Sequence, residues 1–94
     1  MTTKTTPFDA AEYLTEAADH AALLADAFET GEPGYIANAL GIVARARGMS
    51  QVARDAGVSR EALYKALSPG GDPKLSTLLG VARALGFRLT TAAT

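Results

Sequence analysis

The stretch from Met49 to Leu67 constrains this chain more than any other, because it reads as two short helices joined by a tight turn. Ala53 is small enough to let two helices approach closely, and Gly57 is placed to end the first helix in a conformation that costs most other residues energy. Small or apolar residues recur at Val52, Ala53, Ala56, Val58, Leu63 and Ala66. With Val58 and Leu63 pointing inward, this pattern predicts a helix-turn-helix, whose second helix lies in the DNA major groove.

The second of these helices carries the side chains expected to read DNA. In this arrangement the outward residues near the start of the second helix reach base edges. Arg60 is the best candidate, because its planar guanidinium can donate two hydrogen bonds to a guanine edge. Glu61 could accept from a cytosine amino group or hold Arg60 in position. Tyr64 could contact a thymine methyl group or a phosphate, and Lys65 is expected to meet a phosphate.

The starts of the two helices are the expected phosphate contacts. We predict that Ser50 caps the first helix and that Ser59 caps the second. Free backbone N–H groups at such a terminus, with the positive end of the helix dipole, can hold a phosphate. Gln51 lies in the first turn and is expected to contribute there. Arg54 and Lys74 add nonspecific positive charge, whereas Arg45 and Arg47 are explained by their place at a helix C-terminus.

The rest of the chain also reads as helix, so the predicted fold class is all-α. We expect a short helix from Asp9 to Leu14, a second from about residue 15 to Gly31, and a third from about Tyr35 to Arg47. Gly41 lies inside the third and predicts a close helix contact. Residues 68–73 form a loop, and a sixth helix spans about 76–85. Its expected inward residues are Leu75, Leu78, Leu79, Ala82 and Leu85. Residues 87–90 could form a short strand.

Ninety-four residues make one domain with a modest core. We divide it into an acidic N-terminal helical extension (1–34), a helix-turn-helix core (35–90) and a loose tail (91–94), with residues 1–7 as a short frayed arm. The chain has no cysteine, which excludes disulfides and fits a cytoplasmic protein. It shows no apolar run of the roughly 20 residues that span a membrane and no secretory signal.

The net charge of −1 conceals two unequal halves. Residues 1–44 hold one basic and seven acidic residues, whereas residues 45–94 hold eight basic and three acidic ones. Phosphate binding depends on the local field, because salt screens charges beyond about 8–10 Å. The predicted helix-turn-helix lies in the basic half, so the acidic average does not argue against DNA. Solvation of both faces is the alternative explanation.

An enzyme is poorly supported. His20 is the only histidine, which excludes multi-histidine metal sites within one chain. Asp9, Glu12 and Glu16 are acidic at near-helical spacing, but they have no companion base, glycine-rich phosphate loop or metal cluster. We therefore expect no catalytic residues, no metal and no cofactor.

Four segments make the chain similar to a known family. Residues 36–86 resemble a lambda-repressor-like (Cro/C1 or Xre-type) DNA-binding domain. The four segments are 6–14 (TPFDAAEYL), 37–51 (ANALGIVARARGMSQ), 63–73 (LYKALSPGGDP) and 81–89 (VARALGFRL). Together they resemble the addiction-module antidote proteins, the HigA-like antitoxins of type II toxin–antitoxin pairs.

The resemblance implies two activities. Such an antitoxin neutralises a small toxin of the RelE/ParE/HigB type, typically an RNase acting on translated messenger RNA. It also binds operator DNA upstream of its operon as a repressor, usually as a dimer. The positions that match the DNA-reading residues are Ser59, Arg60, Glu61, Tyr64 and Lys65, with Gln51 on phosphate. The long toxin-wrapping segment of many antitoxins is missing, so the acidic residues 1–44 are the expected surface for a basic toxin.

The residues leave two other functions open. One is a stand-alone phage-type transcriptional regulator with the same DNA chemistry and no toxin. The other is a protein-interaction module whose helix-turn-helix no longer binds DNA, an alternative that the negative net charge leaves open. For the DNA-binding readings we expect a homodimer, because one helix-turn-helix buries too little surface for operator affinity. Residues 87–90 are a candidate intermolecular strand.

Overall fold

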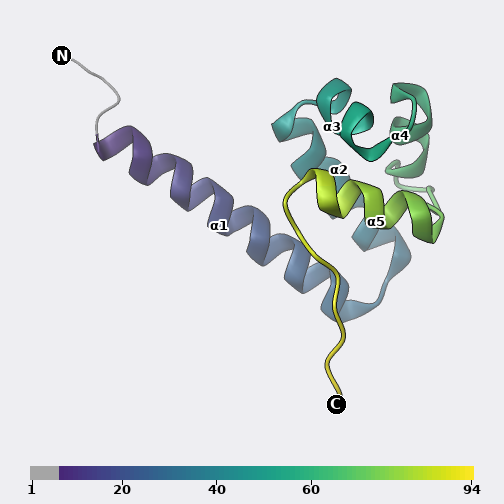
Figure 1. Cartoon of the computed structure of the whole chain (residues 1–94). Coiled ribbons are helices and arrows are strands. Elements are labelled where there is room, and N and C mark those ends of the chain that lie inside the picture. The colour runs from purple at the N-terminus through teal and green to yellow at the C-terminus, as the bar shows by residue number, and fades with distance from the viewer. Residues whose placement is uncertain (1–6) are drawn as a thin grey trace.

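The computed structural model describes residues 7–94, with side chains from Glu16 onward, and consists of five helices (Figure 1). Residues 1–6 of the predicted frayed arm (1–7) lie outside this range, and Pro7 is instead the first residue of α1. The all-α fold class is confirmed, and the arrangement is compatible with a helix-turn-helix bundle. No strand occurs between residues 7 and 94, so the suggested strand at 87–90 is not formed within the chain. The helices are α1 (Pro7–Thr30), α2 (Pro33–Arg47), α3 (Met49–Ala56), α4 (Arg60–Ala66) and α5 (Leu75–Ala84).

The helix α1 is one continuous element, so the predicted break after Leu14 and the predicted start at Asp9 are both wrong. No glycine or proline lies between Pro7 and Gly31, and nothing else in that stretch terminates a helix. The helix ends where predicted: Gly31 has a φ of +69°, and the Thr30 hydroxyl donates to the Ala27 carbonyl at 2.7 Å. Side chains before Glu16, including Tyr13 and Leu14, lie outside the described set.

The C-terminal part of α1 packs against the rest of the molecule. Figure 1 shows α1 running away from the cluster formed by the other four helices. Near its end, Leu24 and Ala27 are buried against α2. The Tyr35 hydroxyl on α2 donates a hydrogen bond of 2.6 Å to the Asp26 carboxylate on α1. The helix is therefore anchored near its C-terminal end, and most of residues 16–30 are exposed.

The core lies among α2, α3, α4 and α5. Its largest fully buried side chains come from three of these helices and from the residue after α5, namely Leu40, Val43, Leu63, Val81 and Leu85. Among the described residues no polar or charged side chain is buried. Apolar burial is the dominant stabilising force in such a core. Burial of the core side chains fixes which faces of α3 and α4 are exposed to solvent.

Two helical glycines mark close approaches. A Cβ on Gly41 of α2 would lie 3.1 Å from the Leu67 carbonyl oxygen, which confirms the predicted close contact there. A Cβ on Gly80 of α5 would lie 3.0 Å from the Ala56 oxygen at the end of α3. Both distances are tighter than an ordinary contact. At both points a backbone carbonyl group therefore lies against a helix, and a residue larger than glycine would push the two segments apart.

The inward face of α5 differs from the predicted one. Leu78, Val81, Ala82 and Leu85 face the body at helical spacing, with Val81 fully buried, whereas Leu75 is 69% and Leu79 40% exposed. Leu79 is turned about 100° from Leu78 around the helix axis. Leu75 is the first helical residue, and its side chain remains in solvent. Leu75 and Leu79 were therefore assigned inward wrongly.

Within the described chain, no helix has both the length and the apolar character required to cross a bilayer.

Candidate nucleic-acid interface

Helices α3 and α4 are joined by three residues whose geometry the sequence predicts well. Gly57 has a φ of +75° and a ψ of 28°, in the left-handed region. Its N–H donates to the Arg54 carbonyl at 3.2 Å, and the Val58 N–H donates to the Ala53 carbonyl at 3.0 Å. This is the paired pattern of a Schellman motif, which satisfies carbonyls at a helix C-terminus. Gly57 therefore ends α3 as expected and redirects the chain into α4.

The inner faces of the two helices are apolar. Val52 and Ala53 on α3 are 2% and 3% exposed, and Leu63 on α4 is fully buried, while Val58 in the turn is half-buried. Helices of eight and seven residues are marginal in isolation, so this packing holds them in place. With Leu63 inward, the other side of α4 faces solvent.

The N-terminus of α4 is capped as predicted. Ser59 has extended backbone angles, and its Oγ accepts a hydrogen bond of 3.0 Å from the Ala62 N–H. A serine in this position satisfies one of the N–H groups that the first turn of a helix leaves unpaired. The cap fixes the helix start immediately before Arg60.

The predicted cap of α3 by Ser50 is wrong. The helix begins at Met49, which is buried, and the residue before it is Gly48 with a φ of +108°. Gly48 ends α2, because its N–H donates to the Ala44 carbonyl at 2.8 Å, and it also starts α3. Ser50 is thus the second residue of the helix, and no side chain caps its first turn.

On the exposed face of α4, Tyr64 contacts Arg60. The Arg60 Nη2 donates to the Tyr64 hydroxyl at 3.4 Å, and its guanidinium carbon lies 5.3 Å from the centre of the Tyr64 ring. A cation over an aromatic ring is a weak attraction at an exposed site. No described hydrogen bond joins Glu61 to Arg60, so the partner that orients the guanidinium is Tyr64.

On α3, a cluster lies around Gln51. The Gln51 Nε2 donates to Asp55 Oδ1 at 2.9 Å, and its Oε1 accepts from Arg54 Nη1 at 2.8 Å. From the sequence, Gln51 and Arg54 are predicted as separate contacts with DNA, and Asp55 is not predicted to lie beside them. The signal was present in the spacing, since residues three and four apart share one helix face. Asp55 places a negative charge beside a predicted phosphate contact.

All the predicted DNA contacts are exposed, and they lie on α3, on α4 and in the turn between these helices. Near the C-terminus of α4, Lys65 lines a shallow hollow of about 650 Å³ together with Lys74, Ser68 and Gly71. Each of the predicted residues is accessible to a large partner, and they are Ser50, Gln51, Ser59, Arg60, Glu61, Tyr64 and Lys65. The described contacts link Arg60 with Tyr64 but link Gln51 only to its own helix.

The acidic residues of the N-terminal region are also exposed where they are described. On α1 these are Glu16, Asp19, Asp26 and Glu29. Asp26 raises the pKa of Tyr35, chiefly because its side chain accepts the Tyr35 hydrogen bond, and burial and the carboxylate charge act in the same direction. His20 is half-buried. Across residues 16–94 no cluster of three or more histidine, aspartate or glutamate side chains is placed to hold a metal ion.

Comparison with known proteins gives one family and one relative. A family model described as "Probable addiction module antidote protein" matches residues 4–93. A protein of Haemophilus influenzae named only "Uncharacterized protein" is 46% identical over 88 residues, covering 94% of this chain and 91% of the relative. No solved structure matches the chain.

Proposed function

Since the chain belongs to the family of probable addiction module antidote proteins, we propose that it is the antitoxin of a type II toxin–antitoxin pair that also represses its own operon. In this proposal it neutralises a small basic toxin of the RelE/ParE/HigB type and binds operator DNA as a homodimer. It acts in the cytoplasm, where toxin and operator are found, and has no catalytic activity of its own. The DNA-binding part is of the HigA-like, lambda-repressor-like type.

The observation that carries the DNA-binding proposal is the exposed face of α4. Burial of Leu63 and Leu67 turns Arg60, Tyr64 and Lys65 outward from a helix that is capped at Ser59. The Tyr64 ring and hydroxyl hold the guanidinium of Arg60 close to the helix. A guanidinium restrained in this way loses less side-chain entropy when it donates two hydrogen bonds to guanine.

The remaining contacts are proposed by position. Glu61 accepts from a cytosine amino group, and Lys65 with Lys74 contacts a phosphate beside the 68–73 loop. At the start of α3, the uncapped first-turn N–H groups receive a phosphate, with Ser50 and Gln51 beside it. The Arg54 guanidinium counters the charge of Asp55 through Gln51.

The toxin is proposed to bind the acidic N-terminal half, residues 1–44. The described part of α1 exposes carboxylates at Glu16, Asp19, Asp26 and Glu29, and the helix projects from the body (Figure 1). A ribosome-directed RNase is expected to be basic, so opposite charges would speed encounter and orient the two proteins. DNA binds within the 35–90 part of the same domain, at its helix-turn-helix and the loop that follows.

Binding of the DNA upstream of the operon tests the first activity. We expect Arg60→Ala to reduce discrimination between operator and unrelated DNA by about 1–3 kcal/mol, because a bidentate base contact is lost. Lys65→Ala is the matched control, and it should weaken binding to all sequences and lower the salt slope by about one. If neither variant changes DNA binding in a gel-shift titration, while circular dichroism shows both folded, α4 does not read DNA. The interaction-module alternative would then hold.

Co-expression with a neighbouring open reading frame tests the second activity. We expect the neighbour to be a small basic protein whose expression arrests growth, and this chain to restore growth. Arg60→Ala should still restore it, because that change lies outside the proposed toxin surface. Failure of the unaltered chain to restore growth would reject the antitoxin role and leave a stand-alone transcriptional regulator.

A further inference from the structure

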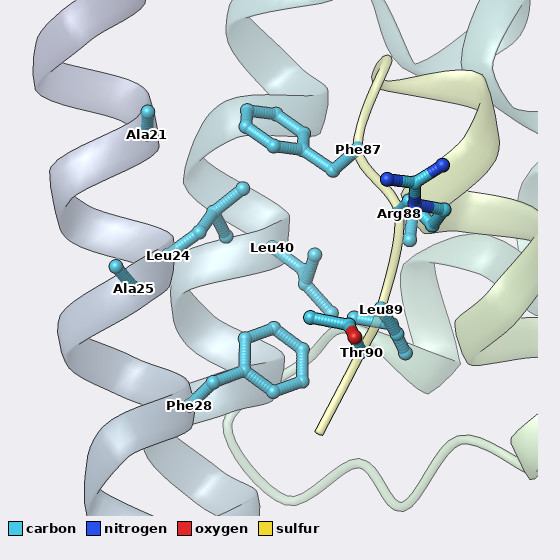
Figure 2. A pocket seen from close by; sticks show the side chains of 10 residues that line it. Ala21, Leu24, Ala25, Phe28, Leu40, Phe87, Arg88, Leu89 and Thr90 are labelled. Carbon is cyan, nitrogen blue, oxygen red and sulfur yellow. The ribbon is translucent and has the colours of Figure 1, made fainter. Parts of the chain in front are cut away.

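An apolar groove separates α1 from the chain segment that follows α5 (Figure 2). It has a volume of about 370 Å³ and lies over Leu24, Leu40 and Ala82. Figure 2 shows Phe28 of α1 and Phe87 directed into the space between the helix and the segment. The groove therefore presents an apolar surface to whatever lies against it, and one of its walls is extended backbone.

That wall, residues 87–90, has the properties of a strand without a neighbour. Gly86, with a φ of +86°, ends the helical region, and the Phe87 N–H donates to the Ala82 carbonyl at 2.8 Å. Beyond Phe87, no described backbone hydrogen bond involves residues 88–94. The side chains alternate, with Phe87 and Leu89 half-buried and Arg88 and Thr90 exposed. Unpaired N–H and C=O groups on such a segment are a template for another strand.

The segment and the groove complement each other if the second strand comes from another copy of this chain. Antiparallel pairing in phase places Phe87 and Leu89 of both copies on the same face of the ribbon. The apolar side chains of each copy then enter the groove of the other. Such an interface is isologous, since the same patch supplies both the side chains and the space that receives them.

The charges of the segment select the register. If Arg88 lay on the two-fold axis, two guanidinium groups would face each other directly, which is destabilising. With Leu89 on the axis, Leu89 faces Leu89, Arg88 faces Thr90, and Phe87 faces Thr91. This register avoids the direct repulsion and pairs Leu89 with Leu89.

The face of α1 beside the groove allows a second copy to approach. Ala18, Ala21, Ala22 and Ala25 are exposed and recur at one-face helical spacing. Ala21 and Ala25 also line the groove. Small side chains there leave room for a strand next to α1, where longer ones would project into its path.

We propose that residues 87–91 of two copies pair as antiparallel strands about a two-fold axis through Leu89, with the apolar side chains of each copy filling the groove of the other. The inference rests on the proposed function, which requires a dimer for a two-fold operator. It adds the surface that forms the dimer.

Single cysteines test the register directly, because the chain has none of its own. Residues facing each other across an antiparallel pair have Cβ atoms about 4.5–5.5 Å apart, close to disulfide geometry. Under mild oxidation of the full-length protein, we expect Leu89→Cys to cross-link at least about tenfold faster than Thr94→Cys, the control in the tail. Arg88→Cys cross-linking faster than Leu89→Cys would overturn the proposed axis.

Sedimentation without DNA tests the interface itself. We expect Leu89→Asp to weaken the dimer by at least roughly a hundredfold, because two carboxylates would be desolvated face to face. A variant that circular dichroism shows folded but that remains dimeric would overturn the proposal. If that dimeric variant instead lost toxin binding, the groove would be a toxin site. Arg60→Ala should leave the dimer unchanged, so failure of the DNA-binding proposal is measured separately.

Discussion

Helix α1 and the α3–α4 pair are helical for different physical reasons. Six of the eleven residues from Ala17 to Ala27 are alanine, the residue with the highest intrinsic helix propensity, and most of that stretch is exposed. Helices α3 and α4 have eight and seven residues, too few to be stable alone. They are held by burial of Val52, Ala53 and Leu63 and by the turn at Gly57.

This difference matters for the two proposed activities. A DNA-reading helix must hold its side chains in fixed positions relative to the body, and α4 is attached by buried residues and close backbone contacts. The exposed length of α1 has few such restraints, so it presents charge over a large surface without a fixed pocket (Figure 1). Changes at α3 and α4 should therefore act through packing and caps, and changes at α1 through local hydrogen bonds and propensity.

Gly71, in the loop that follows α4, offers the most severe test of this contrast. A Cβ there would lie 2.7 Å from the carbonyl carbon of Ala66 and 2.8 Å from the Lys65 oxygen, so backbone would have to move. We expect Gly71→Ala to lower the free energy of unfolding by about 1–3 kcal/mol in urea titrations. Gly70→Ala is the matched control, since nothing lies within 4 Å of its Cβ position. Equal stability of the two variants would show that α4 does not depend on this close approach.

The cap at Ser59 should have a smaller effect. Ser59→Ala removes the acceptor of the Ala62 N–H and should cost about 1 kcal/mol of stability. Ser50→Ala is its control on α3, where the serine caps nothing, and it should change the free energy of unfolding by less than about 0.5 kcal/mol. Thermal unfolding of the two variants side by side measures the difference. A larger loss at Ser50 would mean that α3 has a cap that the backbone geometry does not reveal.

Helix ends and close contacts are predicted correctly from this sequence where they depend on neighbouring residues, as Ser59 and Ser50 show. Gly57 and Ser59 were predicted correctly because their roles depend on a few neighbouring residues. Gly41 was predicted because a glycine inside a helix is costly without a close contact. Ser50 was predicted wrongly because Gly48 serves two helices at once, and burial of Met49 sets the start of α3. The need to bury Met49 arises from packing in the core, so the residues next to Ser50 in the sequence do not reveal it.

Errors at α1 and α5 have a similar origin. Thr15 and Glu16 resemble a helix start, but within an alanine-rich stretch nothing ends the preceding turn. Leu75 and Leu79 resemble core residues, but whether they are covered depends on which helix lies opposite. At the candidate interface, the sequence identified residues that are all exposed. It did not predict that Arg60 would contact Tyr64, or that Asp55 would join Gln51.

The smallest expected effect is at the hydrogen bond that ties α1 to α2. Tyr35→Phe removes the donor to Asp26, and the loss of stability should be slight because the bond is exposed. Its pH dependence is distinctive: the folded-state pKa of Tyr35 is raised above 10, so the bond stabilises fully below pH 10 and its contribution disappears as pH rises through that pKa. Unfolding followed from pH 8 to 11 should show the unaltered chain losing stability more steeply than Tyr35→Phe. Asp26→Asn keeps an acceptor without the charge and should give an intermediate slope. Identical slopes for all three would mean that this bond does not hold α1 to the body in solution.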